Sequence, residues 1–307
     1  MRLLLVVNRS ASSVSARTRV LVRRALAEEH EVEEVATVRR NNATAIATGA
    51  AHDGVDVVVG LGGDGTVNEL ANGLIDTDTA LGVLPGGSTN VFARSIGTPD
   101  DPLAATEHLL AGLRAGAIER IGLGTVGSRV FTFHIGLGFD AAVVEQVEAR
   151  SKMKRYAGHP YYLWCTASTW RRFDRTEPLL RIELPGGEVI DDARFAVVLN
   201  TDPYTYLGSR PVRLAPEATL RRGLVLVALR SLDARTLLPV VASALGRGTR
   251  LRKHRHVVVR TDLERLVVRG HRPFPHQVDG DPLGPTRHLE LAHRPDSLSM
   301  IRPQTPA

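Results

Sequence analysis

One stretch constrains this chain more than any other: residues 55–75, where an apolar run leads through a glycine-rich turn into a helical pattern. The run from Val57 to Leu61 is short and rich in β-branched residues, which predicts a buried strand. It is followed by Gly62-Gly63-Asp64-Gly65-Thr66, after which apolar residues recur at helical spacing. Thr66 and Glu69 have the spacing of a capping box, which predicts that the helix begins at Thr66.

This succession of strand, glycine loop and helix start suits a bound phosphate. Glycine lets backbone N–H groups approach a ligand that a Cβ would keep away, and the first helical turn presents N–H groups at the positive end of its dipole. Asp64 repels a phosphate directly, so its carboxylate predicts a divalent cation between the two. An ordinary strand-to-helix turn can also be rich in glycine, so the motif alone leaves a purely structural interpretation open.

Composition describes a soluble globular protein of about two domains, with 307 residues, 43% hydrophobic and 23% charged. The single cysteine, Cys165, excludes an internal disulfide framework. The formal net charge of +6 favours an anionic partner: a nucleotide, a nucleic acid or an acidic membrane surface. The apolar run at the N-terminus is too short for a secretory leader, and no stretch is long enough to span a membrane, which predicts a cytoplasmic location.

The hydrophobic pattern changes near residue 118. Before it, strands alternate with helices, which predicts an α/β domain (1–118) with a parallel sheet and ligand-binding loops at 8–12, 61–66 and 85–90. Beyond it, short β-like runs separated by turns predict an antiparallel β-sandwich domain (119–295) with helical inserts at 140–173 and 233–250. One of these runs, Val130 to Ile135, predicts a single strand. Residues 296–307 are expected to form a tail that frays or returns to the first domain.

Four segments stand out along nearly the whole chain: Gly62–Glu69, Leu81–Arg94, Gly136–Ala141 and Val278–Asp281. Together, and in this order, they resemble the diacylglycerol kinase catalytic-domain family of bacterial lipid kinases. The resemblance implies a two-domain kinase that transfers the γ-phosphate of ATP, with Mg²⁺, to a lipid hydroxyl. Diacylglycerol is the leading substrate and phosphatidic acid its product. The α/β domain would hold the nucleotide, and the β-sandwich would help to form the lipid site at a membrane surface.

The resemblance also implies roles for individual residues. The nucleotide-binding positions that it implies are Asn8, Arg9, Ser10, Ala11, Ser12, Thr37, Gly62, Gly63, Asp64, Gly65, Thr66, Asn68, Glu69, Ser88 and Thr89. Asp64 would be the metal ligand and a catalytic residue. Asp281 stands where the family has its general-base carboxylate, usually a glutamate, and Asp279 is the alternative base in the same Asp-Gly turn.

The chain departs from the family pattern in two places. Val91 stands where many members have an aspartate, and Arg221-Arg222 replace paired aspartates that hold a structural Mg²⁺ in some members. Arginines do not ligate a cation, so no structural metal is expected there. The basic and aromatic segment 150–173 and the basic helix 237–256 are two candidates for docking on a membrane. Both can equally be core-packed helices with solvated basic ends.

Several alternatives remain open from the sequence. An NAD kinase shares the Gly-Gly-Asp-Gly core, although the Pro85–Arg94 motif argues against it, and a sphingoid-lipid kinase differs only in its substrate. A non-catalytic lipid- or nucleotide-binding relative is kept open by Val91, Asp281 and Arg221-Arg222. Nucleic-acid binding is disfavoured, because the sequence has no aromatic stacking motif and no recognition helix. Whether the chain forms a homodimer is also open.

Overall fold

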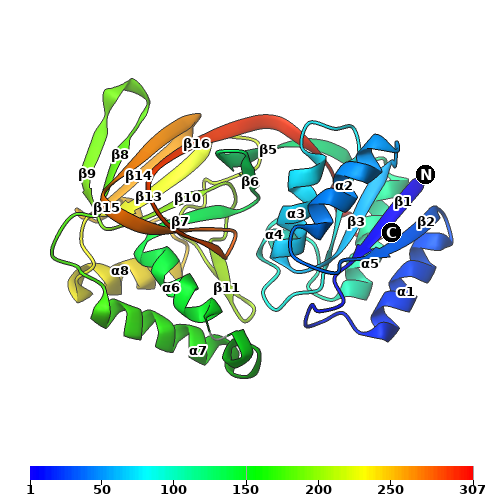
Figure 1. Cartoon of the computed structure of the whole chain (residues 1–307), viewed down its shortest axis with the longest axis horizontal. Helices are drawn as coiled ribbons and strands as arrows, with labels where there is room; N and C mark the ends of the chain where they lie inside the picture. Colours follow the sequence, from blue (N-terminus) through cyan, green and yellow to red (C-terminus); the bar gives the residue numbers. More distant parts are fainter. Residues whose placement is uncertain (150, 307) are drawn as a thin grey trace. The chain divides into compact units, whose positions relative to one another are not determined.

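The computed structural model describes residues 1–149 and 151–306 and divides into two units. Unit 1 comprises Met1–Leu123 and Pro295–Ala307, and unit 2 comprises Gly124–Arg294, so the second is an insertion in the sequence of the first. Strands β5 (Ile118–Val126) and β16 (Asp281–Ile301) each continue from one unit into the other (Figure 1). Arg150, where the first predicted membrane segment begins, lies outside the described residues.

Unit 1 is a parallel sheet covered by helices. Its elements are β1 (Arg2–Val7), α1 (Ala16–Ala27), β2 (Glu31–Ala36), α2 (Asn42–His52), β3 (Val57–Gly62), α3 (Asp64–Leu74), β4 (Ala80–Pro85), α4 (Val91–Ser95) and α5 (Pro102–Arg114), with parts of β5 and β16. The strands pair in parallel in the order β4-β3-β1-β2, and Met300 of β16 pairs in parallel with Leu81 of β4. The predicted α/β domain with a parallel sheet is confirmed.

Burial on both faces explains the uninterrupted apolar runs of these strands. Leu3 and Leu5 of β1 share one hydrophobic core with Leu26 of α1 and Leu109 of α5. Leu4, which must point to the opposite face, is also buried. Helices α1 and α5 contact one another, as do α2 and α3, and Figure 1 shows the two pairs on opposite faces of the sheet.

Unit 2 is built from antiparallel strands with helices added. Its elements are β6 (Arg129–Phe131), β7 (His134–Gly138), α6 (Phe139–Glu148), α7 (Ser151–Arg172), β8 (Leu180–Glu183), β9 (Val189–Ala193), β10 (Phe195–Leu199), β11 (Thr205–Leu207), β12 (Arg210–Val212), β13 (Leu224–Leu229), α8 (Ala234–Ala244), β14 (Val257–Leu263) and β15 (Arg265–Val278). Strands β14, β13, β10, β7 and β15 pair antiparallel in that order, and β15 also pairs with β16 and β8. The predicted antiparallel β region with helical inserts is confirmed.

The prediction of one strand from Val130 to Ile135 is wrong, because the chain breaks there into β6 and β7. The carboxylate of Asp279 accepts hydrogen bonds from the backbone N–H groups of Thr132, Phe133 and His134, at 2.7, 3.0 and 3.0 Å. Three consecutive N–H groups that converge on one carboxylate cannot alternate across a strand. The break is therefore caused by a residue that lies far away in the sequence.

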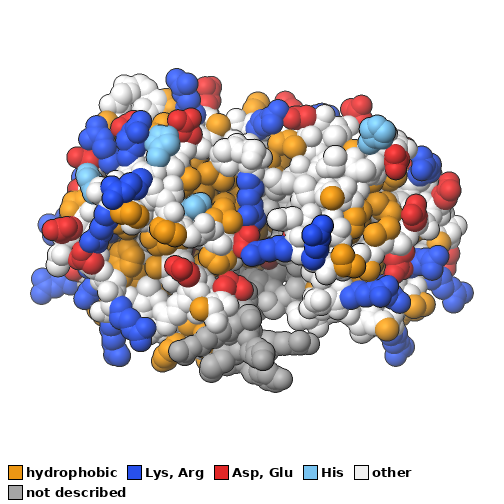
Figure 2. All heavy atoms as spheres, viewed as in Figure 1, with side chains coloured by type: hydrophobic (Ala, Val, Ile, Leu, Met, Phe, Trp, Pro, Cys, Tyr) orange, Lys and Arg blue, Asp and Glu red, His pale blue; other side chains and the backbone are white. Residues whose placement is uncertain are grey.

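Two surface properties bear on the possible partners. On the face that Figure 2 shows, Lys and Arg side chains are interspersed with Asp and Glu, so the excess positive charge does not form a single stripe on that face. Among the described residues, no helix has both the length and the apolar character needed to cross a bilayer.

Candidate active site

The connections of unit 1 diverge between β1 and β3. These strands are neighbours, but the chain leaves β1 through α1 toward the β2 edge and leaves β3 through α3 toward the β4 edge. Loops that diverge in this way from adjacent parallel strands leave a gap at the carboxyl ends, where open α/β sheets bind their ligands. The loops 8–12 and 62–66 therefore flank the position that this fold favours for a ligand.

Asn8 fastens the first loop to the glycine loop. Its backbone N–H donates to the carbonyl of Leu61 at 3.0 Å, and its side-chain amide donates to the Thr66 hydroxyl, also at 3.0 Å. Its amide oxygen accepts the N–H of Ser10 at 3.0 Å, which turns the loop back on itself. Asn8 thus positions the loop, while Arg9, Ser10 and Ser12 are exposed and Ala11 is half-buried.

The third loop packs backbone to backbone against the glycine loop. Gly86 donates its N–H to the carbonyl of Gly62 at 2.7 Å, and a Cβ on Gly86 would lie 2.9 Å from the Gly62 Cα. A Cβ on Gly87 would lie 2.8 Å from the Gly63 Cα. These glycines are needed for the close approach of the two loops, whether or not a ligand binds.

Gly65 differs from the glycines around it. A Cβ built on it meets no atom within 4 Å, and the residue is exposed in the first turn of α3. No packing contact therefore requires a glycine at this position. The backbone here faces open space, which is the geometry that a phosphate needs at a helix N-terminus.

The predicted start of the helix at Thr66 is wrong, since α3 begins at Asp64 with Gly63 as its N-cap. Glu69 does not form a capping box within α3. Its carboxylate instead accepts the N–H groups of Asn41 and Ala43, at 2.9 and 3.0 Å, and so caps the start of α2. A carboxylate that caps a neighbouring helix stabilises the packing of α2 on α3.

Asp64 bridges two helix starts. Its carboxylate accepts the N–H groups of Val91 and Phe92 in the first turn of α4, each at 3.0 Å. Among the described residues, no three His, Cys, Asp or Glu side chains gather to hold a metal. A lone carboxylate still fits Mg²⁺ at a nucleotide, because that ion keeps several waters and is bound by one or two carboxylates plus the phosphates.

The remaining predicted nucleotide residues differ in exposure. Ser88 is exposed and Thr89 half-buried in the third loop, and Thr37 is half-buried at the end of β2, where its N–H donates to Val7 at 2.9 Å. Asn68 is buried in α3, where its amide oxygen accepts from Asn72 at 3.2 Å. Asn68 is therefore part of the helix core, whereas Thr37, Ser88 and Thr89 lie at loop surfaces.

The two aspartates of unit 2 occupy very different environments. Asp279 lies at the turn between β15 and β16 with a positive φ of 48° and is 6% exposed. Besides three backbone N–H groups, the Thr132 hydroxyl donates to it at 2.7 Å. Burial raises the pKa of Asp279 above its ordinary value, against the lowering effect of these hydrogen bonds. Asp279 therefore holds the β6–β7 corner together.

Asp281 is the more accessible carboxylate. Its Oδ2 lies 3.0 Å from the guanidinium of Arg129, and its side chain is 15% exposed. It is the first residue of β16 and pairs with Val278 across the turn. The ion pair with Arg129 orients this partly exposed carboxylate.

A third carboxylate, Asp140, escaped the sequence analysis as a candidate site residue. It is 4% exposed at the start of α6, where it accepts hydrogen bonds from the Tyr204 hydroxyl and, at 2.9 Å, from the Gln277 amide. The Gln277 oxygen accepts the N–H of Gly280 at 2.7 Å, which connects this cluster to the turn that carries Asp279. Burial raises the pKa of Asp140, and both hydrogen bonds oppose that shift.

A local signal for Asp140 does exist in the sequence. A Cβ on Gly136 would lie 1.6 Å from an Asp140 carboxylate oxygen, so the glycine at 136 makes room for this side chain. The Gly136–Ala141 segment contains both residues. The hydrogen-bond partners of Asp140, however, lie 64 and 137 residues further along the chain.

Comparison with known proteins supports the motifs. Residues 2–126 match the family described as the diacylglycerol kinase catalytic domain. The chain is 36% identical over 138 residues to a diacylglycerol kinase of Bacillus subtilis (strain 168) and 31% identical over 137 residues to one of Staphylococcus aureus (strain Newman). Each match covers 44% of this chain, and the two cover 44% and 42% of those relatives, so less than half of their length is matched.

Solved structures resemble the whole fold. A crystal structure described as a diacylglycerol kinase from Bacillus anthracis str. Sterne aligns with a TM-score of 0.77 at 21% identity, covering 98% of this chain and 96% of that one. A second structure from the same strain aligns with a TM-score of 0.79 at 20% identity, covering 100% and 96%. At this identity the likeness establishes the fold alone. Over residues 2–126 the chain is thus similar to the diacylglycerol kinase catalytic-domain family.

Proposed function

We propose that the chain is an ATP-dependent lipid kinase that transfers the γ-phosphate of ATP to the free hydroxyl of diacylglycerol and releases phosphatidic acid and ADP. The observation that carries this proposal is the packing of loops 8–12 and 85–90 against loop 62–66, with open space in front of Gly65. The family of residues 2–126 supports a kinase, and the names of its relatives support a lipid acceptor.

The nucleotide phosphates would lie against the first turn of α3. The backbone of Gly63, Gly65 and Thr66 lies at the positive end of this helix, where a phosphate is favoured. Asn8 holds the first loop beside it, and the exposed Ser88 lies on the loop that packs against Gly62 and Gly63. These residues bind and orient the phosphate chain, and orientation supplies much of the rate in phosphoryl transfer.

Asp64 would hold Mg²⁺, which when bound neutralises the charge on the phosphate oxygens. Because both carboxylate oxygens already accept N–H groups from α4, the side chain cannot rotate freely. A carboxylate fixed in this way keeps its negative charge at one position in the first turn of α3.

Asp281 would act as the general base. Its carboxylate takes the proton of the lipid hydroxyl as that oxygen forms a bond to the γ-phosphorus and the bond from phosphorus to the β,γ-bridging oxygen breaks. Arg129 orients the carboxylate from one side. Asp279 and Asp140 are positioning residues in this scheme, since their hydrogen bonds hold the turn on which Asp281 lies.

An assay with purified protein, Mg²⁺ and γ-labelled ATP tests the proposal. The acceptors are diacylglycerol, ceramide, a sphingoid base and NAD⁺, each offered alone. Label in phosphatidic acid is the expected result. Label only in a sphingoid phosphate would mean that the substrate is a sphingoid base instead of diacylglycerol. Label only in NADP⁺ would contradict a lipid kinase. ATP binding without any labelled product would identify a non-catalytic relative.

A further inference from the structure

Helix α8 has apolar residues on two faces, only one of which is covered. Val240 and Ala244 point into a hydrophobic core that Leu251 shares. Leu238 and Val241 lie on the other side of the helix and are 71% and 51% exposed. Single exposed apolar residues are ordinary, but two on successive turns form a stripe that water solvates poorly.

A cationic cavity opens beside the same turns. It has a volume of about 680 Å³ and lies between α8 and the segment 246–254. Its polar lining includes Ser243, Arg247, Thr249, Arg250, Lys253 and His254, and no Asp or Glu of the described chain is among its lining residues. The Ser243 hydroxyl lies in its wall and has no hydrogen-bond partner among the described residues.

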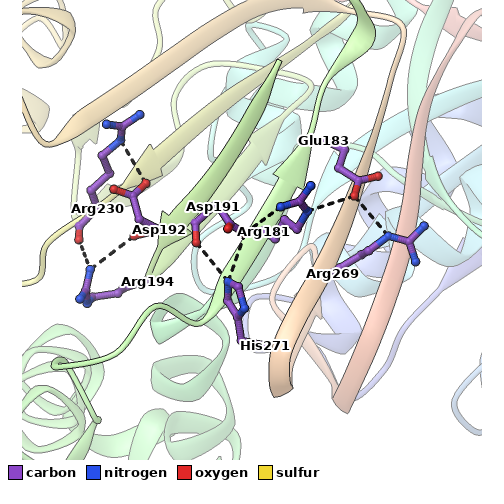
Figure 3. A network of polar contacts seen from close by, with 8 residues as sticks. All are labelled: Arg181, Glu183, Asp191, Asp192, Arg194, Arg230, Arg269 and His271. Atoms are coloured by element: carbon purple, nitrogen blue, oxygen red, sulfur yellow. Dashed lines mark hydrogen bonds and ion pairs between the residues drawn. The ribbon is translucent and has the colours of Figure 1, made fainter. Parts of the chain in front are cut away.

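The cations that line this cavity differ from several other cations of unit 2, which form ion pairs with carboxylates. Figure 3 shows the opposite arrangement on the outer strands, where arginines alternate with carboxylates. Arg181 lies 3.3 Å from Asp191, and Arg230 lies 3.3 Å from Asp192. Around the cavity, Arg252 pairs with Glu217 at 3.1 Å.

Three cations that line the cavity are exposed: Arg247, Arg250 and Lys253. Among the described residues, no carboxylate lies within ion-pair distance of them. Several cations without internal partners indicate an external anion.

We propose that α8 and residues 246–254 form a membrane-docking surface for anionic phospholipids. Leu238 and Val241 insert among the acyl chains, and one lipid phosphate enters the cavity to contact Arg247, Arg250 and Lys253. A bilayer explains both features, because it offers hydrocarbon beside phosphate, whereas a nucleic acid would leave the two apolar side chains without a partner. The inference rests on the proposed function, since a kinase acting on diacylglycerol meets its substrate at a membrane.

Vesicle sedimentation tests the surface. The wild-type chain should sediment with vesicles of equimolar phosphatidylcholine and phosphatidylglycerol, and much less with phosphatidylcholine alone. Combining Arg247→Gln, Arg250→Gln and Lys253→Gln should weaken binding by about fivefold for each charge removed. Leu238→Ser with Val241→Ser should weaken it by about tenfold and leave its dependence on salt unchanged.

A matched control removes three other exposed arginines of unit 2 through Arg222→Gln, Arg265→Gln and Arg287→Gln. It should lose less than about fivefold, because these residues lie outside the cavity. Equal losses in the control and in the cavity variant overturn the proposal. So does normal vesicle binding by the serine variant, or a loss of binding that follows Leu163→Ser with Trp164→Ser on α7 instead of the α8 changes.

Turnover of short-chain diacylglycerol in detergent micelles separates the two proposals. It should be the same in wild type, cavity variant and serine variant, because none of these residues belongs to the catalytic scheme. If the wild type phosphorylates no lipid, the proposed function fails while sedimentation still reports on α8. If it phosphorylates lipid but the α8 variants bind vesicles normally, only the docking surface fails.

Discussion

The carboxylate of Asp64 accepts the backbone N–H of Val91 at 3.0 Å, so one side chain in the first turn of α3 caps the start of α4. We expect Asp64→Asn to reduce turnover by at least about a hundredfold, because a neutral amide gives Mg²⁺ no charged ligand. The amide also faces an N–H with its NH₂ group, which should cost about 1–3 kcal/mol of unfolding free energy. Initial rates and thermal unfolding of the same preparation measure both effects.

Asp101→Ala serves as the control for this change. Asp101 caps α5 by accepting the N–H groups of Leu103 and Ala104, at 3.0 and 2.9 Å. Its loss should cost about 1 kcal/mol of stability and leave turnover unchanged. Near-normal turnover in Asp64→Asn would contradict a metal-binding role for Asp64 and leave it only the role of capping α4.

Gly65→Ala separates ligand binding from folding. A methyl group at Gly65 meets no protein atom within 4 Å, so stability should stay constant or rise by about 0.5–1 kcal/mol, as for alanine in other helices. ATP affinity should fall by at least about tenfold, because the methyl group would enter the space proposed for the phosphates. Titration with a fluorescent ATP analogue and thermal unfolding provide the two readouts.

The matched variant is Gly49→Ala in α2, another exposed helical glycine whose Cβ would meet nothing within 4 Å. It should show the same change in stability and bind ATP normally. Identical ATP affinities in the two variants would contradict a phosphate site at the first turn of α3.

Local patterns were sufficient for most of unit 1. The run Val57–Leu61 and the glycine turn predicted a strand and a helix because all the information lies within a few residues. The start of α3 was misplaced by two residues because Glu69 has a better partner than its own helix: it caps Asn41 and Ala43, which lie 28 and 26 residues away. No local rule identifies such an acceptor.

The features of unit 2 depend on longer separations. The break between β6 and β7 is caused by Asp279, which lies 147 residues beyond Thr132. The buried Asp140 obtains its partners from Tyr204 and Gln277, on different strands or loops. A single sequence shows that these residues are polar but does not show that they meet. The sequence therefore predicted one uninterrupted strand where β6 and β7 are separated by a corner, and it showed Asp140 only as part of the Gly136–Ala141 motif.

Asp279→Asn and Asp281→Asn should have opposite effects. Asp279 is buried and accepts four hydrogen bonds, so its replacement should cost on the order of 3 kcal/mol in unfolding free energy. Asp281 forms an ion pair with the partly exposed Arg129, and its replacement should cost less stability than that of Asp279 while turnover falls by at least about a hundredfold. ATP affinity should be unchanged in Asp281→Asn. Retained turnover in that variant, with ATP bound, would mean that another group is the base.

His134 should make unit 2 sensitive to acid. It is 5% exposed beside the Tyr204 ring, at 4.7 Å between ring centroids, and its Nδ1 has no hydrogen-bond partner among the described residues. Burial lowers the pKa of His134 from its ordinary value of 6.5 to about 3. Between these two pH values, His134 is protonated in the unfolded chain but neutral in the folded chain. Stability is therefore full above pH 6.5 and is lost as the pH falls toward 3.

His134→Phe isolates this effect, because phenylalanine preserves the ring but does not titrate. The unfolding free energy of wild type relative to the variant should be largest at neutral pH and smaller by about 3 kcal/mol near pH 4.5. Urea unfolding at neutral pH and near pH 4.5 measures this difference. Asp279 and Asp140 titrate in the opposite sense, but they are present in both proteins and cancel in the comparison. A difference that does not vary with pH would mean that His134 is protonated equally in the folded and unfolded chains, and the acid sensitivity would then have another source.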